Sequence, residues 1–235
     1  MTAHKPGDPT TLNRLYGRSK GKALRAGQQA LIDTLLPQVA VPAEGPVTSE
    51  RLFGDDRPLH FEIGFGGGEH LAARADMLPD HGFVGCEPFI NGVAQALVHI
   101  SGDHGTHEPL ANVRLHHGDA LEVLSRVPDG TLSFLYLLHP DPWPKARHAK
   151  RRFVHPAMLP VVARVLKPGA QWRIASDDPT YQAWVAEVFA GSALFTLSQP
   201  AESRPAGWPP TRYEAKALRE GRRPLYWVAV RSAGS

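Results

Sequence analysis

The sequence contains a single cysteine, Cys86, among its 235 residues. One cysteine excludes an intrachain disulfide and a cysteine-rich zinc site, and it is typical of a protein from a reducing compartment. The twelve histidines include no His-Glu-x-x-His pair, so we expect no bound metal. The sequence also lacks a run of about 18 apolar residues and an N-terminal apolar signal core. We therefore expect a cytoplasmic protein without a membrane-spanning helix.

Charge is unevenly distributed along the chain, although the formal net charge is only +3. Residues 53–142 carry 13 acidic and 4 basic side chains, whereas the remaining residues carry 10 acidic and 22 basic ones. Basic flanks of this kind are either solvated surface or a nucleic-acid-binding surface. The charge pattern alone leaves both interpretations open.

Strand and helix patterns alternate through most of the chain, which predicts an α/β fold with a doubly wound, mostly parallel sheet. The expected strands are Leu59–Gly64, Gly82–Glu87, Val113–His116, Leu132–Leu138, Ala170–Ser176, Ser192–Leu197 and Pro224–Val230. The expected helices are Gln28–Leu36, Glu69–Met77, Ile90–Ile100, Leu121–Arg126, Pro156–Val165 and Tyr181–Ala190. Pro37 is expected to stop the first helix, and Lys167-Pro168-Gly169 to form a turn. The last two strands predict a terminal antiparallel hairpin. We expect residues 1–40 to form a basic arm with a short helix, and residues 41–235 to form one domain.

A glycine-rich segment at the end of the first strand includes Glu62, Gly64 and Gly66. Glycine lets the backbone turn sharply and approach a ligand closely, but a tight turn without a ligand explains these residues nearly as well. In a dinucleotide site this turn holds a pyrophosphate, which an acidic residue directly before the glycines would repel. Glu62 therefore favours a cationic ligand without phosphate. The order acid-x-Gly-x-Gly-x-Gly resembles the first motif of class I methyltransferases, which bind S-adenosylmethionine.

Two further acidic residues follow the next two strands. Glu87 ends the second strand, where a carboxylate can accept two hydrogen bonds from a ribose diol; a solvated acid at a strand end is the alternative. Asp119 follows the third strand and is either a helix cap or a ligand contact, and these roles are compatible.

The fourth strand leads directly into Asp141, which lies between Pro140 and Pro142. Five cations follow within a few residues: Lys145, Arg147, Lys150, Arg151 and Arg152. A rigidly held carboxylate beside a basic tract indicates chemistry on a polyanion, with the cations on its phosphates. Asp-Pro-Trp-Pro superficially resembles a motif of methyltransferases that act on exocyclic amines. Trp143 could stack on a base, although a buried structural role is favoured.

Together, these segments resemble the bacterial tRNA (guanine-N7)-methyltransferase family over nearly the whole chain. The most specific part is Pro140–Arg152, and Ser176-Asp177 and Thr211–Glu214 also match. The resemblance implies a class I methyltransferase fold and S-adenosylmethionine as the methyl donor. It implies N7 of a tRNA guanine, at position 46 in the variable loop, as the acceptor. The oligomeric state is expected to be a monomer or a homodimer.

The resemblance also implies roles for individual residues. The cofactor contacts would be Glu62, Gly64, Gly66, Glu87, Asp119 and Asp141. The tRNA contacts would be Lys145, Asp177, Thr211, Arg212, Tyr213 and Glu214, and the RNA backbone would meet Arg147, Lys150, Arg151 and Arg152. The sequence departs from the family pattern where His139 replaces an aromatic residue, where Ser176 replaces a threonine, and in the more basic segment Ala217–Pro224.

Guanine N7 carries a lone pair and no proton, so its methylation needs no general base, and no His–Asp pair near Asp141 is evident in the sequence. We expect Asp141, helped by Asp177, to stabilise the positive charge that the purine gains. Two alternatives remain open: a methyltransferase of an exocyclic amine or small molecule, and an RNA-binding module without activity. A dehydrogenase is disfavoured by Glu62.

Overall fold

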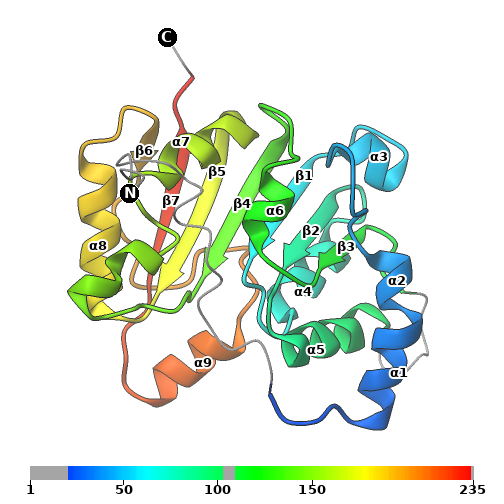
Figure 1. Ribbon diagram of the computed structural model, residues 1–235. Coiled ribbons are helices and arrows are strands. Elements are labelled where there is room, and N and C mark those ends of the chain that lie inside the picture. Colours follow the sequence, from blue (N-terminus) through cyan, green and yellow to red (C-terminus); the bar gives the residue numbers. More distant parts are fainter. Residues whose placement is uncertain (1–20, 103–108, 234–235) are drawn as a thin grey trace, which may run out of the picture.

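The computed structural model describes residues 21–102 and 109–233, which form a sheet of seven strands between helices (Figure 1). The strands are β1 (Leu59–Ile63), β2 (Gly82–Cys86), β3 (Val113–His116), β4 (Leu132–Leu138), β5 (Leu166–Ser176), β6 (Phe195–Leu197) and β7 (Leu225–Arg231). Their order is β3-β2-β1-β4-β5-β7-β6. Strands β1 to β5 are parallel, and β7 is antiparallel to both β5 and β6. The predicted mostly parallel sheet with an antiparallel terminal pair is confirmed.

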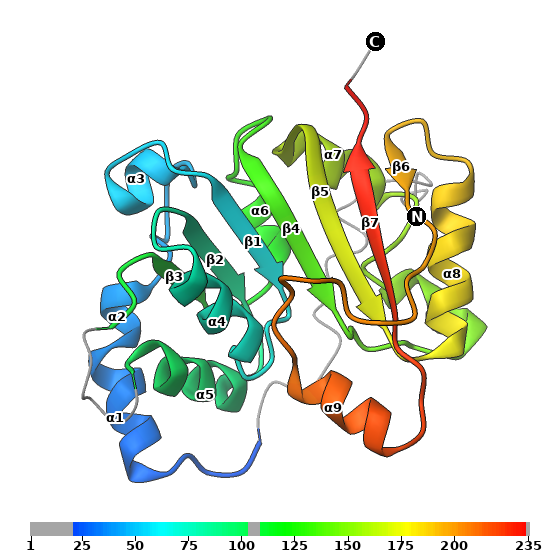
Figure 2. The same cartoon turned by 180° about the vertical axis from the view of Figure 1, so that it is seen from behind.

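Helices cover both faces of this sheet (Figures 1 and 2). They are α1 (Ala26–Thr34), α2 (Leu36–Val39), α3 (Ser49–Phe53), α4 (Glu69–Met77), α5 (Ile90–Ile100), α6 (Ala120–Leu124), α7 (Met158–Val165), α8 (Pro179–Ala190) and α9 (Arg212–Arg219), with the 3-10 helix η3 at Ala146–Arg151. Helices α6, α7 and α8 pack on one face through a core that includes Phe61, Trp172 and Tyr181. Helices α4 and α5 pack on the opposite face around Phe83 and Leu97, together with α1 and α2. Burial of these apolar side chains is the main stabilising contribution to the fold.

Strand β1 is buried at every residue, as expected for a central parallel strand. Two of its residues are nevertheless polar: His60 and Glu62 point to the same side because side chains alternate along a strand. A buried polar group needs a hydrogen-bond partner, and both residues have one. His60 bonds to the Tyr136 hydroxyl at 2.9 Å, and the partner of Glu62 belongs to the site described below.

Two local predictions were wrong. Pro37 does not stop a helix but lies in the first turn of α2, where a missing backbone N–H costs nothing. Lys167–Gly169 belongs to an extended β5, with a register shift between Leu132 and Phe134 of β4. The last two strands, β6 and β7, pair antiparallel as predicted, and the connection between them contains α9. Residues 1–20 of the expected basic arm lie outside the described residues. The division of the chain at residue 40 stays a prediction.

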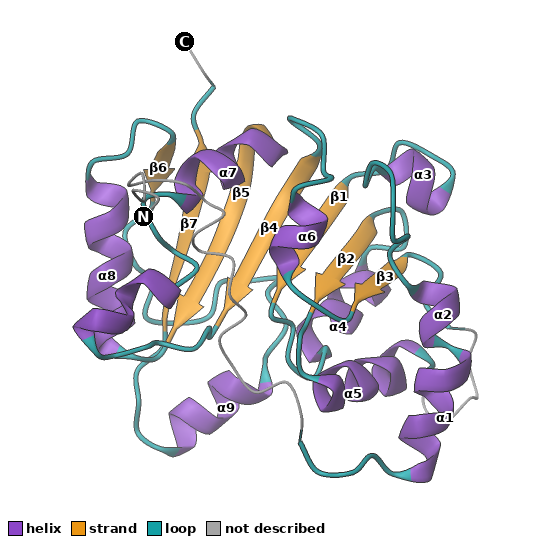
Figure 3. Ribbon diagram, in the orientation of Figure 1, coloured by secondary structure: helices purple, strands orange, loops and turns teal. Residues whose placement is uncertain are grey.

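The topology creates a binding crevice at one edge of the sheet. Helices α4 and α5 connect β1 to β2 and β2 to β3 on one face, whereas α6 connects β3 to β4 on the other. A change of face of this kind opens a crevice at the carboxyl ends of the strands. Figure 3 shows α9 beyond this edge, which the arrowheads of β4 and β5 mark. Among the described residues, no helix combines the length and apolar character needed to cross a membrane.

Candidate functional site

A cavity of about 610 Å³ lies at the carboxyl ends of β1, β2, β3 and β4. This volume is within the usual range for small-molecule sites. The predicted site residues that line it are Gly64, Gly66, Glu87, Asp119, Asp141, Lys150, Arg151, Arg152 and Tyr213. The chain thus brings three carboxylates from separate strand ends to one cavity. Glu62, Lys145, Arg147, Asp177, Thr211, Arg212 and Glu214 are not part of its wall.

The glycine-rich turn after β1 has a backbone that other residues rarely adopt. Gly64 and Gly66 have φ angles of 66° and 59°. A Cβ atom on Gly66 would also lie 2.8 Å from Cε2 of Tyr213, closer than such atoms pack. The turn therefore needs glycine for its conformation and for the approach of α9.

Glu87 is held by the glycine-rich turn itself. Its Oε2 accepts the N–H of Gly66 at 2.8 Å, and its Oε1 accepts the N–H of Phe89 at 2.9 Å. Burial raises the pKa of this carboxyl, while the two N–H groups act in the opposite direction. Each oxygen keeps a second lone pair for a ligand. Glu87 is thus fixed at the cavity wall with unused acceptor capacity.

Glu62 lies inside the protein, beside the cavity rather than on its wall. Its Oε2 is 2.7 Å from Nδ1 of His70 on α4, and the two side chains are 4% and 2% exposed. The other ring nitrogen of His70, Nε2, is buried without a hydrogen-bond partner among the described residues. His70 was not predicted from the sequence, where its only signal is its place in the first turn of the helix after the glycines.

Asp119 caps a helix, which is one of the two roles that the sequence left open for it. Its Oδ1 accepts the N–H of Leu121 at 2.9 Å and so caps α6. The same residue lines the cavity. The cap fixes the orientation of the Asp119 carboxylate. Its other oxygen, Oδ2, keeps acceptor sites that a ligand can use.

Asp141 is exposed and lies on the cavity wall after β4. The flanking residues His139 and Trp143 have φ angles of 52° and 44°, which non-glycine residues rarely adopt. Arg152 supports this turn, since its Nε donates to the Pro142 carbonyl and an Nη donates to the Trp143 carbonyl, both at 3.0 Å. The surrounding structure therefore determines the path of the Asp141 loop.

Two sequence-based expectations for this loop need correction. Arg152 is only 6% exposed, and its guanidinium lies over the Trp184 ring at 5.0 Å. Arg152 is thus placed to support the loop from inside and not to bind RNA phosphates at the surface. Part of its side chain still lines the cavity. Trp143 is half-buried on the cavity wall and not a core residue. The Arg151 guanidinium lies 4.8 Å from its ring centroid.

The remaining cations of the tract are on or near η3. Lys145, Arg147 and Lys150 are exposed, whereas Arg151 is half-buried. Lys150 and Arg151 reach the cavity, and Lys145 and Arg147 lie outside it. A positively charged surface therefore adjoins the Asp141 side of the cavity.

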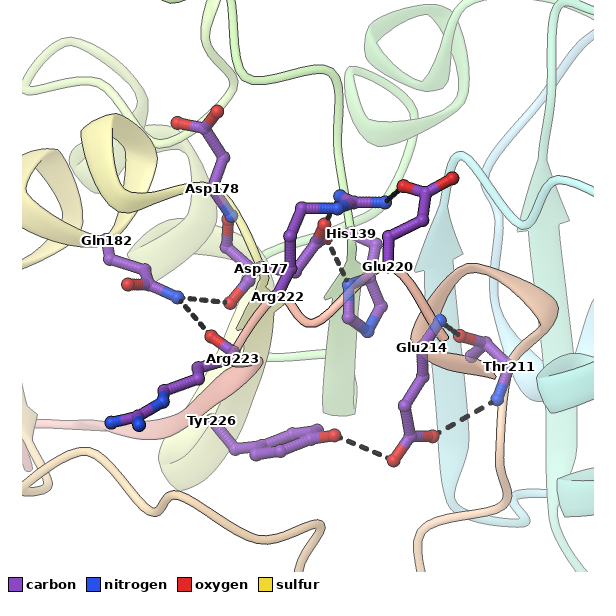
Figure 4. Close-up of polar contacts among 11 residues, drawn as sticks. His139, Asp177, Asp178, Gln182, Thr211, Glu214, Glu220, Arg222, Arg223 and Tyr226 are labelled. Carbon is purple, nitrogen blue, oxygen red and sulfur yellow. Dashed lines mark hydrogen bonds and ion pairs between the residues drawn. The ribbon is translucent and has the colours of Figure 1, made fainter. Parts of the chain in front are cut away.

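A polar cluster connects the end of β5 with the segment around α9 (Figure 4). Asp177 Oδ1 is 2.8 Å from Nδ1 of His139, and Asp177 Oδ2 forms an ion pair with Arg222. Arg222 also pairs with Glu220 at 2.6 Å. The fold thus forms a His–Asp pair through His139, two residues before Asp141, and this pair was not evident in the sequence because Asp177 is distant along the chain. Burial lowers the pKa of His139 to about 4, so that the imidazole is neutral near pH 7.

Thr211 and Glu214 are used within the protein. Glu214 donates its N–H to Thr211 Oγ1 at 3.0 Å, and its own carboxylate accepts the Thr211 N–H at 3.4 Å, which forms a capping box at the start of α9. Glu214 Oε1 also accepts hydrogen bonds from Tyr226 and Arg204. Tyr213 lines the cavity, and Arg212 lies 3.7 Å from Glu69. The cap therefore aims Arg212 and Tyr213 toward the glycine-rich turn.

Comparison with solved structures supports the fold. The chain is similar to a 16S rRNA methyltransferase, KamB, with a TM-score of 0.57 and 17% identity over 83% of this chain and 98% of that one. It is also similar to an antibiotic-related methyltransferase, with a TM-score of 0.53 and 15% identity over 76% of this chain and 90% of that one. At these identities the likeness concerns the fold alone.

Comparison with protein sequences reaches further. Residues 56–226 match a family described as "Putative methyltransferase". The tRNA (guanine-N(7)-)-methyltransferase of Sphingopyxis alaskensis is 66% identical over 97% of this chain and 98% of its own length. That of Novosphingobium aromaticivorans is 63% identical over 92% of this chain and 93% of its own length. The chain therefore belongs to the tRNA (guanine-N(7)-)-methyltransferase family.

Proposed function

We propose that the protein transfers a methyl group from S-adenosylmethionine to N7 of a guanine in tRNA, and that this guanine is number 46 of the variable loop. One observation carries the proposal: Glu87, Asp119 and Asp141 share a cavity whose rim continues into a surface of exposed cations. Carboxylates at the strand ends suit a cationic cofactor, and the cations beside them suit a polyanionic substrate. We further propose that the enzyme is cytoplasmic and acts as a monomer or homodimer.

The residues of the cavity fit the proposed cofactor. Glu87 has acceptor capacity for a ribose diol, and no other group of the described residues covers the backbone at Gly64 on the cavity wall. Asp119 would accept a hydrogen bond from the adenine. Glu62, held by His70, would act on the ammonium group from beneath the turn. When bound, S-adenosylmethionine supplies a methyl group attached to a positively charged sulfur.

Asp141 is the proposed catalytic residue, and its role is electrostatic. Guanine N7 has a lone pair and no proton, so no side chain has to remove one. The ring becomes positively charged as N7 is methylated, and a carboxylate at the cavity wall would stabilise that charge. The support of the Pro142 and Trp143 carbonyls by Arg152 keeps the carboxylate in place before the substrate binds.

The RNA would be held outside the cavity. Lys145, Arg147, Lys150 and Arg151 would meet phosphates, and Asp177, Arg212 and Tyr213 would meet the nucleoside. Thr211 and Glu214 would contribute through the shape of the α9 cap, because their side chains bond to each other's backbone. Trp143, half-buried at the cavity, could stack on the guanine.

The decisive experiment incubates the protein with methyl-labelled S-adenosylmethionine and bulk tRNA and then identifies the labelled nucleoside. We expect 7-methylguanosine, which sensitises the RNA to reduction and aniline cleavage. A labelled exocyclic amine would instead assign the protein to another methyltransferase class. Tight tRNA binding without transfer or cofactor binding would favour an RNA-binding module.

A further inference from the structure

Asp177 is the meeting point of three parts of the chain that are distant in sequence (Figure 4). One oxygen of its carboxylate meets the His139 ring after β4, and the other meets Arg222 between α9 and β7. Asp177 itself follows β5. The side chains of His139 and Asp177 are 3% and 12% exposed, whereas that of Arg222 is 40% exposed. The contact between His139 and Asp177 is therefore shielded from water, where a hydrogen bond is stronger than at an exposed surface, and Arg222 closes the cluster on the solvent side.

We propose that His139 and Arg222 are positioning residues that hold the Asp177 carboxylate in one orientation for the tRNA guanine. The inference rests on the proposed function. It assigns a role to His139, which stands in place of an aromatic residue, and to Arg222, which lies in the more basic segment Ala217–Pro224. Both side chains meet the Asp177 carboxylate.

The chemistry of the histidine fits this role. The imidazole is neutral, and a carboxylate only accepts hydrogen bonds, so Nδ1 carries the proton and donates it to Asp177. The backbone of His139 is also fixed, because its N–H donates to the Ala175 carbonyl at 2.8 Å. An apolar aromatic ring at this position could fill the same space but could not donate to Asp177.

The arginine is held from both directions. Its guanidinium pairs with Asp177 and with Glu220, and Gln182 donates both to the Ser176 carbonyl at 2.9 Å and to the Arg223 carbonyl at 2.8 Å. The segment that carries Arg222 is therefore tied to β5 independently of the ion pair. Each Asp177 oxygen receives one partner and keeps one lone pair, so the carboxylate can still accept the N–H groups of a guanine.

The first experiment compares Arg222→Gln with Arg223→Gln, which removes a neighbouring positive charge whose side chain points away from Asp177 (Figure 4). We expect Arg222→Gln and His139→Phe each to lower kcat/KM for tRNA about tenfold. The affinity for S-adenosylhomocysteine and the melting temperature should stay near wild type. Arg223→Gln should lower kcat/KM only about twofold, and Arg222→Lys should recover part of the loss.

The second experiment tests whether both residues act through Asp177. In an Asp177→Asn background, Arg222→Gln and His139→Phe should change kcat/KM by less than about twofold, because coupled residues are not additive. Full additivity, or equal losses for Arg222→Gln and Arg223→Gln, would overturn the positioning role. The role would also be overturned if Arg222→Gln had a lower melting temperature than wild type and lost kcat/KM only in assays near that temperature, with no loss in assays well below it. A wild-type protein that makes no 7-methylguanosine would instead refute the proposed function itself.

Discussion

The two sides of the cavity are built differently. On the sheet side, the carboxylates of Glu62, Glu87 and Asp119 are each fixed by a hydrogen bond to His70 or to a backbone N–H. On the outer side, Lys145, Arg147 and Lys150 extend from a short 3-10 helix and are exposed. The hydrogen bonds hold each of these carboxylates in one conformation, whereas long exposed lysine and arginine side chains can adopt many.

This difference corresponds to the two proposed ligands. A small cofactor binds more tightly when the polar groups that contact it are already ordered. A tRNA spreads its charge over many phosphates, and flexible lysine and arginine side chains can follow them without exact placement. The cofactor side should therefore be sensitive to single substitutions, and the RNA side should respond to the sum of several.

The largest effect is expected at Asp141, where the two sides meet. Asp141→Ala should lower kcat by about 100- to 1000-fold, the usual cost of removing one electrostatic stabiliser. Binding of S-adenosylhomocysteine, measured by calorimetry, should change much less. Asp129→Ala, an exposed carboxylate paired with Arg164, provides the control. Near-normal transfer in Asp141→Ala would refute the catalytic role.

Glu87→Gln tests the ordered side and should weaken S-adenosylhomocysteine binding by about 1–3 kcal/mol, while tRNA affinity stays unchanged. The pH dependence is a second test. Because burial raises the pKa of Glu87, its carboxylate should be protonated, and cofactor binding lost, at a higher pH than for an ordinary glutamate. The Gln variant should lack this acidic limb. Glu50→Gln, at an exposed position on α3, is the control.

Arg152→Met distinguishes internal support from RNA contact. Loss of the guanidinium leaves the Pro142 and Trp143 carbonyls without their donor, which should lower the free energy of unfolding by about 1–3 kcal/mol. Urea denaturation measures this value. Lys150→Met, which removes an exposed cation of the same tract, should leave stability unchanged. If Arg152→Met were as stable as wild type but bound tRNA more weakly, Arg152 would be an RNA contact and not an internal support.

The smallest effect per residue is expected for the exposed cations. Combined replacement of Lys145, Arg147 and Lys150 by alanine should lower the slope of log affinity for tRNA against log salt by up to about 0.7–0.9 for each phosphate that these side chains neutralise. Filter binding at several salt concentrations gives this slope. A single exposed replacement should have a barely measurable effect, and an unchanged slope in the triple variant would exclude this tract from RNA binding.

The sheet was predictable because its signals are local. Alternating apolar segments predict the strands and helices along the chain, and the glycines after β1 predict a turn that can approach a ligand, without knowledge of distant contacts. The partners within the site were not predictable in this way. His70 meets Glu62, and Arg152 meets the carbonyls before it, only because of how helices and loops pack in three dimensions. Nothing in the spacing separates Arg152, which is buried, from Lys150, which is exposed.

Strand β7 follows all the other strands in the chain but occupies an inner place in the sheet, between β5 and β6. During synthesis, β6 leaves the ribosome before β7, and within the described residues β7 is its only strand partner. Until β7 emerges, the edge of β5 remains open, and open strand edges promote aggregation. Helix α9, which carries Tyr213 to the cavity, lies between these two strands in sequence. We therefore expect the part of the cavity wall that Tyr213 supplies to be completed late, together with the sheet, when the exposed strand edge of a nascent chain is covered.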